Sequence, residues 1–216
     1  MKRILCFGDS NTWGTIPDGS FTHSNISTAY PQLLQKYLGG GKYHVISEGM
    51  PSRTTDIDDI KYPKGNRNGA LFFPTCVISH DPIDYIVLML GTNDLKTKFN
   101  RNAHEIAKTI QEKYINFVKN ELKSELSRVP KFVVVAPTVV DEQKLNDGMF
   151  DGATEKSKQF NQLYFEVAQN TNSLFFPNTN LECGQDGIHL VPKSHVFLAK
   201  ALAKIIKFDK TNKKDV

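Results

Sequence analysis

The sequence has no long hydrophobic run, and this absence bears on where the protein works. None of its 216 residues belongs to a stretch of the roughly eighteen apolar residues that a membrane-spanning helix needs. The amino-terminal segment MKRILCFGDS has a short apolar run that ends before Asp9, without the small-residue cleavage site of a secretory signal. We therefore expect a cytoplasmic protein with no membrane partner.

Cysteine is scarce, and patterns that bind metals are missing. The three cysteines, Cys6, Cys76 and Cys183, are widely spaced and form no CxxC motif. An odd number at this spacing argues against both a disulfide framework and a zinc site. The histidines have no partners at the spacing of metal ligands. We expect free, mostly buried thiols, no metal and no other cofactor.

Several motifs that define other classes are also absent. There is no G-x-S-x-G, which argues against an ordinary α/β-hydrolase. The glycine run at 39–41 lacks the Lys-Ser or Lys-Thr of a phosphate-binding loop. The formal net charge is +4, but no basic stripe carries interleaved aromatics, so nucleic acid is not an expected partner. The lysine-rich residues 208–216 are interpreted as a solvated tail.

What is present is an alternation of strand-like and helix-like segments. The expected strands are residues 2–8, 43–47, 83–90, 131–136 and 174–176, and the expected helices are residues 27–38, 102–126, 154–170 and 192–206. This alternation predicts one α/β domain over residues 1–207, a three-layer α/β/α arrangement with a mostly parallel, five-stranded, flavodoxin-like sheet. In such sheets the functional residues lie beyond the carboxyl ends of the strands.

The segment GDSNTWG, residues 8–14, follows the first expected strand. At a strand-to-helix turn a serine Oγ is exposed, and nearby backbone N–H groups can stabilise an oxyanion. This favours Ser10 as a nucleophile, although Asp9 or Ser10 is also explained as an ordinary helix cap.

Two further polar segments follow later strands. In GTND, residues 91–94, the Asn93 carboxamide can donate to an oxyanion, and Asp94 can cap a helix; a plain turn explains the same residues. In DGIHL, residues 186–190, a tight turn lets the Asp186 carboxylate hold the His189 imidazole. Together the three segments supply a nucleophile, an oxyanion donor and an oriented base, which acyl transfer requires.

GDSNTWG, GTND and DGIHL resemble blocks I, III and V of the SGNH (GDSL-like) hydrolases, in the same order and across nearly the whole chain. RILCFGDSNTWG, EGMPSRTTDIDD and IVLMLGTND are further similar to the arylesterase and acyl-transferase branch. The resemblance implies that Ser10 is the nucleophile and an oxyanion donor through its N–H. It also implies that Asn93 is the side-chain donor, His189 the base and then the acid, and Asp186 the residue that orients His189. The branch further implies a homo-oligomer.

The sequence departs from the family pattern at two places. The family often has Leu or Ile where this chain has Asn11, so we expect changed packing or an added polar contact, with a modest effect on activity. Block II usually presents a glycine N–H to the oxyanion. Aligning on the Thr-Thr pair at 54–55 places Ser52 at that position, with Gly49 as the alternative; Pro51 has no N–H.

Three more residues are candidates for a substrate pocket. Trp13 either floors an acyl or aryl pocket or packs the first turn, and Asp9 lies next to the nucleophile. Arg53 either steers an acidic group or, more simply, forms a structural or surface ion pair. His195 is expected at the start of the last helix, in a capping or surface role. The polar segment 138–153 is expected to form one wall of the substrate cleft or a surface connection.

The function that these features predict is a serine esterase acting on small, short-chain esters by hydrolysis or acyl transfer. Carbohydrate acetylesterase or lysophospholipase-type activity on the same triad is an alternative. A metal-dependent phosphoesterase is an alternative of another class, because Asp9, Asn93, Asp94, Asp186 and His189 carry oxygen and nitrogen ligands. A further alternative is a binding module on an inactive hydrolase fold. The expected partner is a small-molecule ester.

Overall fold

The structure is a computed structural model that describes residues 1–216 except 21, 23–27, 60–62, 64, 146–147 and 210–216. Its centre is a parallel sheet with the strand order β2-β1-β3-β4-β5. The strands are β1 (Lys2–Gly8), β2 (Tyr43–Gly49), β3 (Tyr85–Met89), β4 (Lys131–Val135) and β5 (Leu174–Phe176). The parallel five-stranded sheet confirms the predicted fold class.

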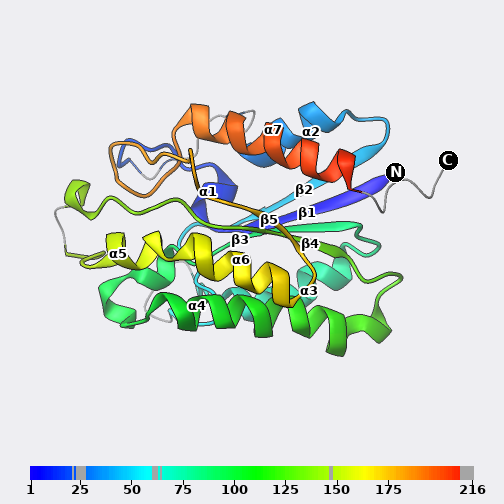
Figure 1. The fold of residues 1–216 in the computed structure, drawn as a ribbon, viewed down its shortest axis with the longest axis horizontal. Coiled ribbons are helices and arrows are strands. Elements are labelled where there is room, and N and C mark those ends of the chain that lie inside the picture. Colours follow the sequence, from blue (N-terminus) through cyan, green and yellow to red (C-terminus); the bar gives the residue numbers. More distant parts are fainter. Residues whose placement is uncertain (21, 23–27, 60–62, 64, 146–147, 210–216) are drawn as a thin grey trace.

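Helices cover both faces of the sheet and complete the three layers (Figure 1). On one face lie α2 (Tyr30–Leu38) and α7 (Pro192–Phe208). On the other lie α3 (Gly69–Ser79), α4 (Ala103–Thr109), α5 (Ala153–Lys158) and α6 (Phe160–Asn170). Every connection between parallel strands therefore crosses through a helical layer, as parallel pairing requires.

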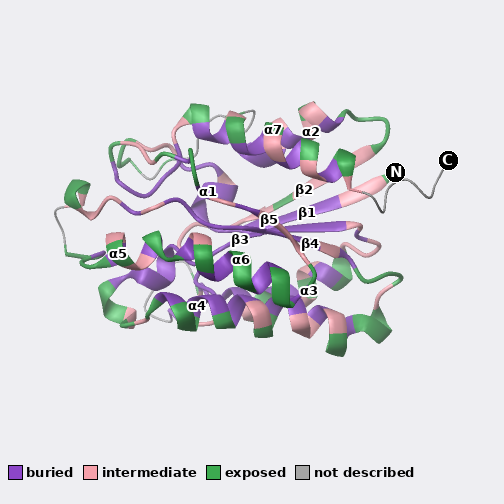
Figure 2. Ribbon diagram, viewed as in Figure 1, coloured by how far each residue is buried: buried purple, intermediate pink, exposed green. Residues whose placement is uncertain are grey.

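The central strands β1, β3 and β4 are buried on both sides, whereas the edge strand β2 is only partly buried. Alternate residues of a strand point to opposite faces of the sheet. In β1, Leu5 and Phe7 belong to the core beneath α3, α4 and α6, whereas Ile4 and Cys6 belong to the core beneath α2 and α7. Figure 2 shows the middle of the sheet as a buried layer between helices whose outer surfaces are exposed. This double burial explains why the strands read as unbroken apolar runs rather than alternating ones.

The helical layers differ in three places from the prediction. The helix expected at 102–126 begins as α4 with an Asn102–Glu105 capping box, then continues with π-helical hydrogen bonding over Ile110–Glu121 and a 3-10 turn at Leu122–Glu125. The helix expected at 154–170 is interrupted at Gln159, between α5 and α6. Helix α3 was not predicted, because its sequence GALFFPTCVIS is apolar on every side and contains Pro74.

Helix α3 carries three consecutive apolar residues that differ in burial. Phe73 is fully buried in the core, whereas Leu71 and Phe72 are 60% and 41% exposed. Helix α7 extends to Phe208, and the Asp209 carboxylate accepts hydrogen bonds from the Tyr85 hydroxyl and Lys131. Phe208 and Asp209, the first two residues of the predicted tail 208–216, therefore belong to the folded domain, and the remainder, 210–216, lies outside the described residues.

Within the described part of the chain, no helix is long and apolar enough to cross a membrane. Cys6, Cys76 and Cys183 are all free thiols; the first is buried and the other two are half-buried.

Candidate active site

Residues from the two ends of the sequence meet at the carboxyl edge of the sheet. Ser10 is the first residue of the short helix α1 (Ser10–Trp13), directly after β1. Asp186 and His189 lie in the loop between β5 and α7. His189 is 179 residues from Ser10 along the chain. Asn93 begins a 3-10 turn, Asn93–Leu95, just after β3. The structure thus brings together all four residues that the three motifs singled out.

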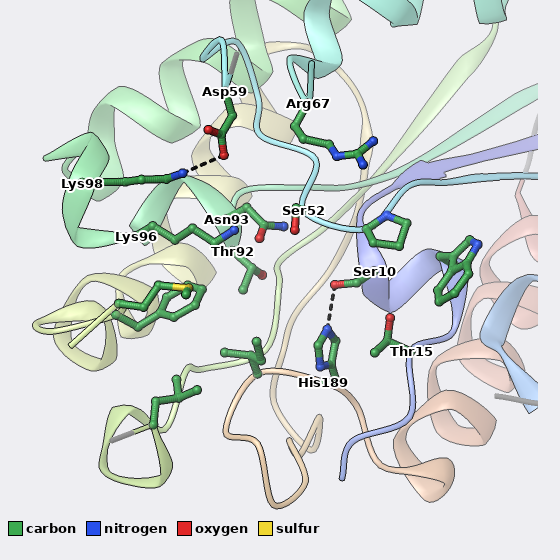
Figure 3. A pocket seen from close by; sticks show the side chains of 16 residues that line it. Ser10, Thr15, Ser52, Asp59, Arg67, Thr92, Asn93, Lys96, Lys98 and His189 are labelled. Atoms are coloured by element: carbon green, nitrogen blue, oxygen red, sulfur yellow. Dashed lines mark hydrogen bonds and ion pairs between the residues drawn. The ribbon is translucent and has the colours of Figure 1, made fainter. Parts of the chain in front are cut away.

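A chain of hydrogen bonds links Ser10, His189 and Asp186. The His189 Nε2 lies 2.8 Å from the Ser10 Oγ, and its Nδ1 lies 2.6 Å from the Asp186 Oδ2 (Figure 3 shows the first of these). Burial raises the pKa of Asp186, but hydrogen bonds from the His189 imidazole and backbone outweigh it, so the pKa is lowered overall. Because Asp186 stays ionised, its carboxylate accepts a hydrogen bond from the His189 Nδ1–H, and Nε2 is then the unprotonated, basic nitrogen.

The loop that carries Asp186 and His189 is held rigidly. Asp186 Oδ1 accepts the backbone N–H groups of Ile188 and His189 at 3.1 and 2.9 Å. Gly187 has φ 70°, and a Cβ at this position would lie 2.3 Å from the Asp141 carbonyl oxygen. The Asp-Gly turn that the sequence indicated is therefore real, and only glycine fits it without strain.

Ser10 is fixed by the turn before it. Asp9 is the N-cap of α1, and its Oδ1 accepts the Asn11 N–H at 2.9 Å. Gly8 has no room for a side chain, because a Cβ would lie 2.0 Å from the Thr12 Oγ1. Asp9 is 1% exposed, and burial, partly opposed by this hydrogen bond, raises its pKa to about 6. Asp9 does not line the cavity, which corrects its prediction as a pocket residue.

Three groups at the site are placed to donate to an oxyanion. In the residues that the structure describes, the N–H groups of Ser10 and Ser52 have no hydrogen-bond acceptor. The Asn93 Nδ2 donates one hydrogen to the Arg53 carbonyl oxygen at 3.1 Å and keeps a second. Ser52 lines the cavity with φ 64°. Gly49 instead ends β2, where a Cβ would lie 2.2 Å from the Trp13 nitrogen, so the geometry favours Ser52 over Gly49 as donor.

Arg53 supports this edge from below and does not line the cavity. It is 4% exposed, and its Nη1 donates to the Gly8 carbonyl oxygen at 2.7 Å and to the Glu48 carbonyl oxygen. Its guanidinium carbon lies 4.0 Å from the centre of the Phe7 ring. Its prediction as a pocket residue is therefore wrong: Arg53 ties the ends of β1 and β2 together through backbone carbonyls.

Asp94 also has a different role from the helix cap that its position suggested. It is fully buried, and both carboxylate oxygens accept the Thr55 N–H, at 3.0 and 2.9 Å. Burial raises its pKa to about 7, although the bonds from Thr55 oppose the shift. Asp94 thereby connects the turn after β3 to the segment that carries Ser52. Among the described residues, no three His, Cys, Asp or Glu side chains gather as a metal site would require.

His195, expected in a surface or capping role, is 5% exposed and caps a helix other than its own. Its Nδ1 accepts the N–H of Tyr30, the first residue of α2, at 3.3 Å, and its ring stacks on the Tyr30 ring. The surface interpretation is therefore wrong. Burial, and secondarily the nearby His189, lowers the pKa of His195 to about 4.

A cavity of about 610 Å³ opens over Ser10 and His189. This volume suits a small organic ligand. Trp13 lines it, as one of its two predicted roles required, and so do Leu145, Met149 and Phe150 of the segment expected to form a cleft wall. Figure 3 shows the Ser10 and His189 side chains facing each other in this cavity.

Four charged side chains of the cavity were missed by the sequence analysis: Asp59, Arg67, Lys96 and Lys98. Only Lys96 had a sequence signal, because it follows Asn93 by three residues and shares its turn. Asp59 and Lys98 form an ion pair at 2.7 Å across two separate segments, which no spacing in the sequence indicates.

Comparison with known proteins agrees with the geometry. The model of the GDSL-like lipase/acylhydrolase family matches residues 6–195. The chain is similar to Est24, a carbohydrate acetylesterase from Sinorhizobium meliloti, with 35% identity and a TM-score of 0.85 over 96% of this chain and 99% of that one. It is similar to the aryl esterase of M. smegmatis, with 32% identity and a TM-score of 0.84 over 96% and 99%.

A lipase/acylhydrolase from Enterococcus faecalis shares the fold, with 21% identity and a TM-score of 0.64 over 96% of each chain. No curated protein sequence gives a significant match.

Proposed function

The chain belongs to the GDSL-like lipase/acylhydrolase family, and from this premise we propose that it is a serine esterase that cleaves small carboxylic esters through an acyl-Ser10 intermediate. The observation that carries the proposal is the unbroken hydrogen-bond chain from Ser10 through His189 to Asp186 at the cavity floor.

In the first half of the reaction the Ser10 Oγ attacks the ester carbonyl carbon while His189 Nε2 takes the hydroxyl proton. The negative charge that develops on the carbonyl oxygen faces the N–H groups of Ser10 and Ser52 and the Asn93 Nδ2. Each such donor lowers the barrier because it is already oriented before the charge appears. The tetrahedral intermediate then expels the alcohol, which receives the proton from His189.

In the second half water takes the place of the alcohol. His189 Nε2 removes a proton from the water, whose oxygen attacks the acyl carbon, and the collapse of the second intermediate returns the proton to Ser10 and releases the acid. An alcohol that enters in place of water gives acyl transfer with the same proton movements. Throughout, Asp186 keeps the imidazole in one tautomer and stabilises its protonated form.

The names of the similar proteins support short-chain esters as substrates. The acetylesterase and the aryl esterase both exceed 30% identity to this chain over almost their full lengths. We propose acetyl esters of phenols and of sugars as the first substrate classes. The Trp13 side of the cavity, next to Ser10, is the place where a small acyl group would pack.

The test is hydrolysis of p-nitrophenyl acetate by the wild type and Ser10→Ala in the presence of a chelator. The proposal expects turnover by the wild type and a loss of about 10⁴-fold or more in the variant, as for other serine triads. A serine-reactive phosphonate should label the wild type alone. If both proteins are inactive with chelator and added metal restores the wild type, the metal-dependent phosphoesterase replaces this proposal.

A further inference from the structure

Lys96 places a buried positive charge in the cavity, and no residue that the structure describes serves as its counter-ion. It follows the Asn93–Leu95 turn, and its side chain reaches into the cavity beside Asn93 and Thr92 (Figure 3). The residue is 7% exposed. In the described ranges of the chain, its ammonium group makes no hydrogen bond or ion pair with a protein acceptor.

The acidic groups whose fields reach Lys96 are each bound to another partner. Asp59 pairs with Lys98 at 2.7 Å. Asp94 accepts the N–H and hydroxyl of Thr55. Asp9 accepts the Asn11 N–H. None of the three is in contact with the Lys96 ammonium, so among the described residues its charge has no acidic partner.

The charged residues that line the cavity are mostly positive, like Lys96 itself. Its charged lining consists of one acid, Asp59, and three cations, Arg67, Lys96 and Lys98. Arg67 is also buried, with 8% exposure. Burial, and secondarily Lys98, lowers the pKa of Lys96, as a partly desolvated ammonium requires. A buried and unpaired cation is destabilising, and such a group in a cleft is a candidate for binding a ligand.

We propose, on the basis of the esterase function above, that the substrate is an ester that also carries a carboxylate, and that Lys96 binds this carboxylate. The same cavity is also lined by Leu145, Met149, Phe150 and Ile188, whose apolar side chains suit a hydrocarbon segment of the substrate. One carboxylate satisfies the donor capacity that the protein leaves open at Lys96, and the apolar wall disfavours a more strongly hydrated group.

The test compares charged and neutral esters of the same shape. One pair has the charge on the alcohol side: 4-acetoxybenzoate and its methyl ester. The other has it on the acyl side: mono-4-nitrophenyl adipate and its methyl ester. For each pair the ratio of kcat/KM, charged over neutral, is measured at pH 7.5 for the wild type, Lys96→Met and Lys108→Met. Lys108 is the matched control, because it is an exposed lysine on α4 that does not line the cavity.

We expect Lys96→Met to lower this ratio about 10- to 100-fold in one of the two pairs, the effect of losing a charge-assisted contact. The pair that responds identifies the half of the substrate that bears the carboxylate. Lys108→Met should keep both ratios within about twofold, because a surface charge acts weakly through water and salt. A general electrostatic role of Lys96 in the reaction would change charged and neutral esters equally, and that outcome overturns the proposal.

A measurement on the wild type alone guards against a variant that does not fold. Hexanoate should inhibit p-nitrophenyl acetate hydrolysis at about tenfold lower concentration than hexanamide; equal inhibition overturns the proposal. The two proposals fail separately. If the wild type cleaves neutral esters but shows none of these charge effects, only the proposed carboxylate site is contradicted. If the wild type cleaves no ester, charged or neutral, the proposed esterase function itself is contradicted.

Discussion

Asn11 holds His189 in place through the backbone on both sides of it. The Asn11 Nδ2 donates to the Ile188 carbonyl oxygen at 3.1 Å, and its Oδ1 accepts the Leu190 N–H at 2.8 Å. All of these groups are buried. Asn11, next to the proposed nucleophile Ser10, therefore fixes the loop that carries His189, and the polar contact expected at this departure from the family pattern is present.

We predict that Asn11→Ala destabilises the protein by about 2–4 kcal/mol, because it leaves a buried carbonyl and a buried N–H without partners. At temperatures where the variant is folded, kcat for p-nitrophenyl acetate should fall about tenfold with little change in KM, since a displaced base affects the chemical step more than binding. Urea unfolding and steady-state kinetics measure the two effects. Asn178→Ala, which loses a buried bond to the Pro137 carbonyl oxygen, is the control that should lower stability alone.

Asp186→Asn is predicted to reduce kcat by about 10³- to 10⁴-fold while the fold persists. The amide can present its N–H₂ to His189 Nδ1 and so select the tautomer whose Nε2 carries a proton and cannot accept one from Ser10. Circular dichroism should show a wild-type fold. A loss of less than tenfold would mean that Asp186 contributes little to orienting the imidazole.

His195 predicts a loss of stability in acid. Its pKa is about 4 in the folded protein, against an ordinary value near 6.5, so the unfolded chain binds more protons between these values. Stability should therefore fall as the pH drops from about 6.5 to about 4, by up to about 3 kcal/mol. Urea unfolding at pH 7 and pH 4.5 tests this against His195→Gln, which does not titrate; parallel losses in the two proteins would contradict the assignment.

Ser52→Gly is predicted to stabilise the protein by about 1 kcal/mol. Ser52 adopts φ 64°, a left-handed conformation that is costly for a residue with a Cβ and free for glycine. Ser52→Ala keeps that cost and serves as the control in the same urea titration. If glycine destabilises the protein, the serine side chain makes a stabilising contribution larger than the strain.

Much of the fold was predictable because burial on both faces leaves a strong local signature. β1 and β5 have the bounds that were predicted, and the other strands differ by a few residues at their ends. Helix α3 was missed because its apolar residues have no helical periodicity, which is the property that sequence patterns report. The change to π-helical bonding after Thr109 was also not predicted, because an amphipathic pattern does not distinguish it from an α-helix.

The residues of the site likewise fall into those that the sequence predicted and those that it did not. Ser10, Asn93, Asp186 and His189 were found because motifs after successive strands of a parallel sheet must converge on one edge. Arg53 and Asp9 were misplaced, since a charged residue next to a motif gives no sign of whether it points into the cleft or beneath it. His195 bonds to Tyr30, which lies 165 residues away along the chain. Lys96 is notable because no acidic side chain among the described residues pairs with it. Both are properties of the folded chain alone.

The distance of 179 residues between Ser10 and His189 has a consequence for synthesis. Ser10, the proposed nucleophile, is translated before any of the strands β2 to β5, and His189, its proposed base, only after all five strands. On the proposed mechanism, a nascent chain that ends before this loop carries a serine hydroxyl without its base. Reactivity then depends on the docking of the last loop onto the completed sheet.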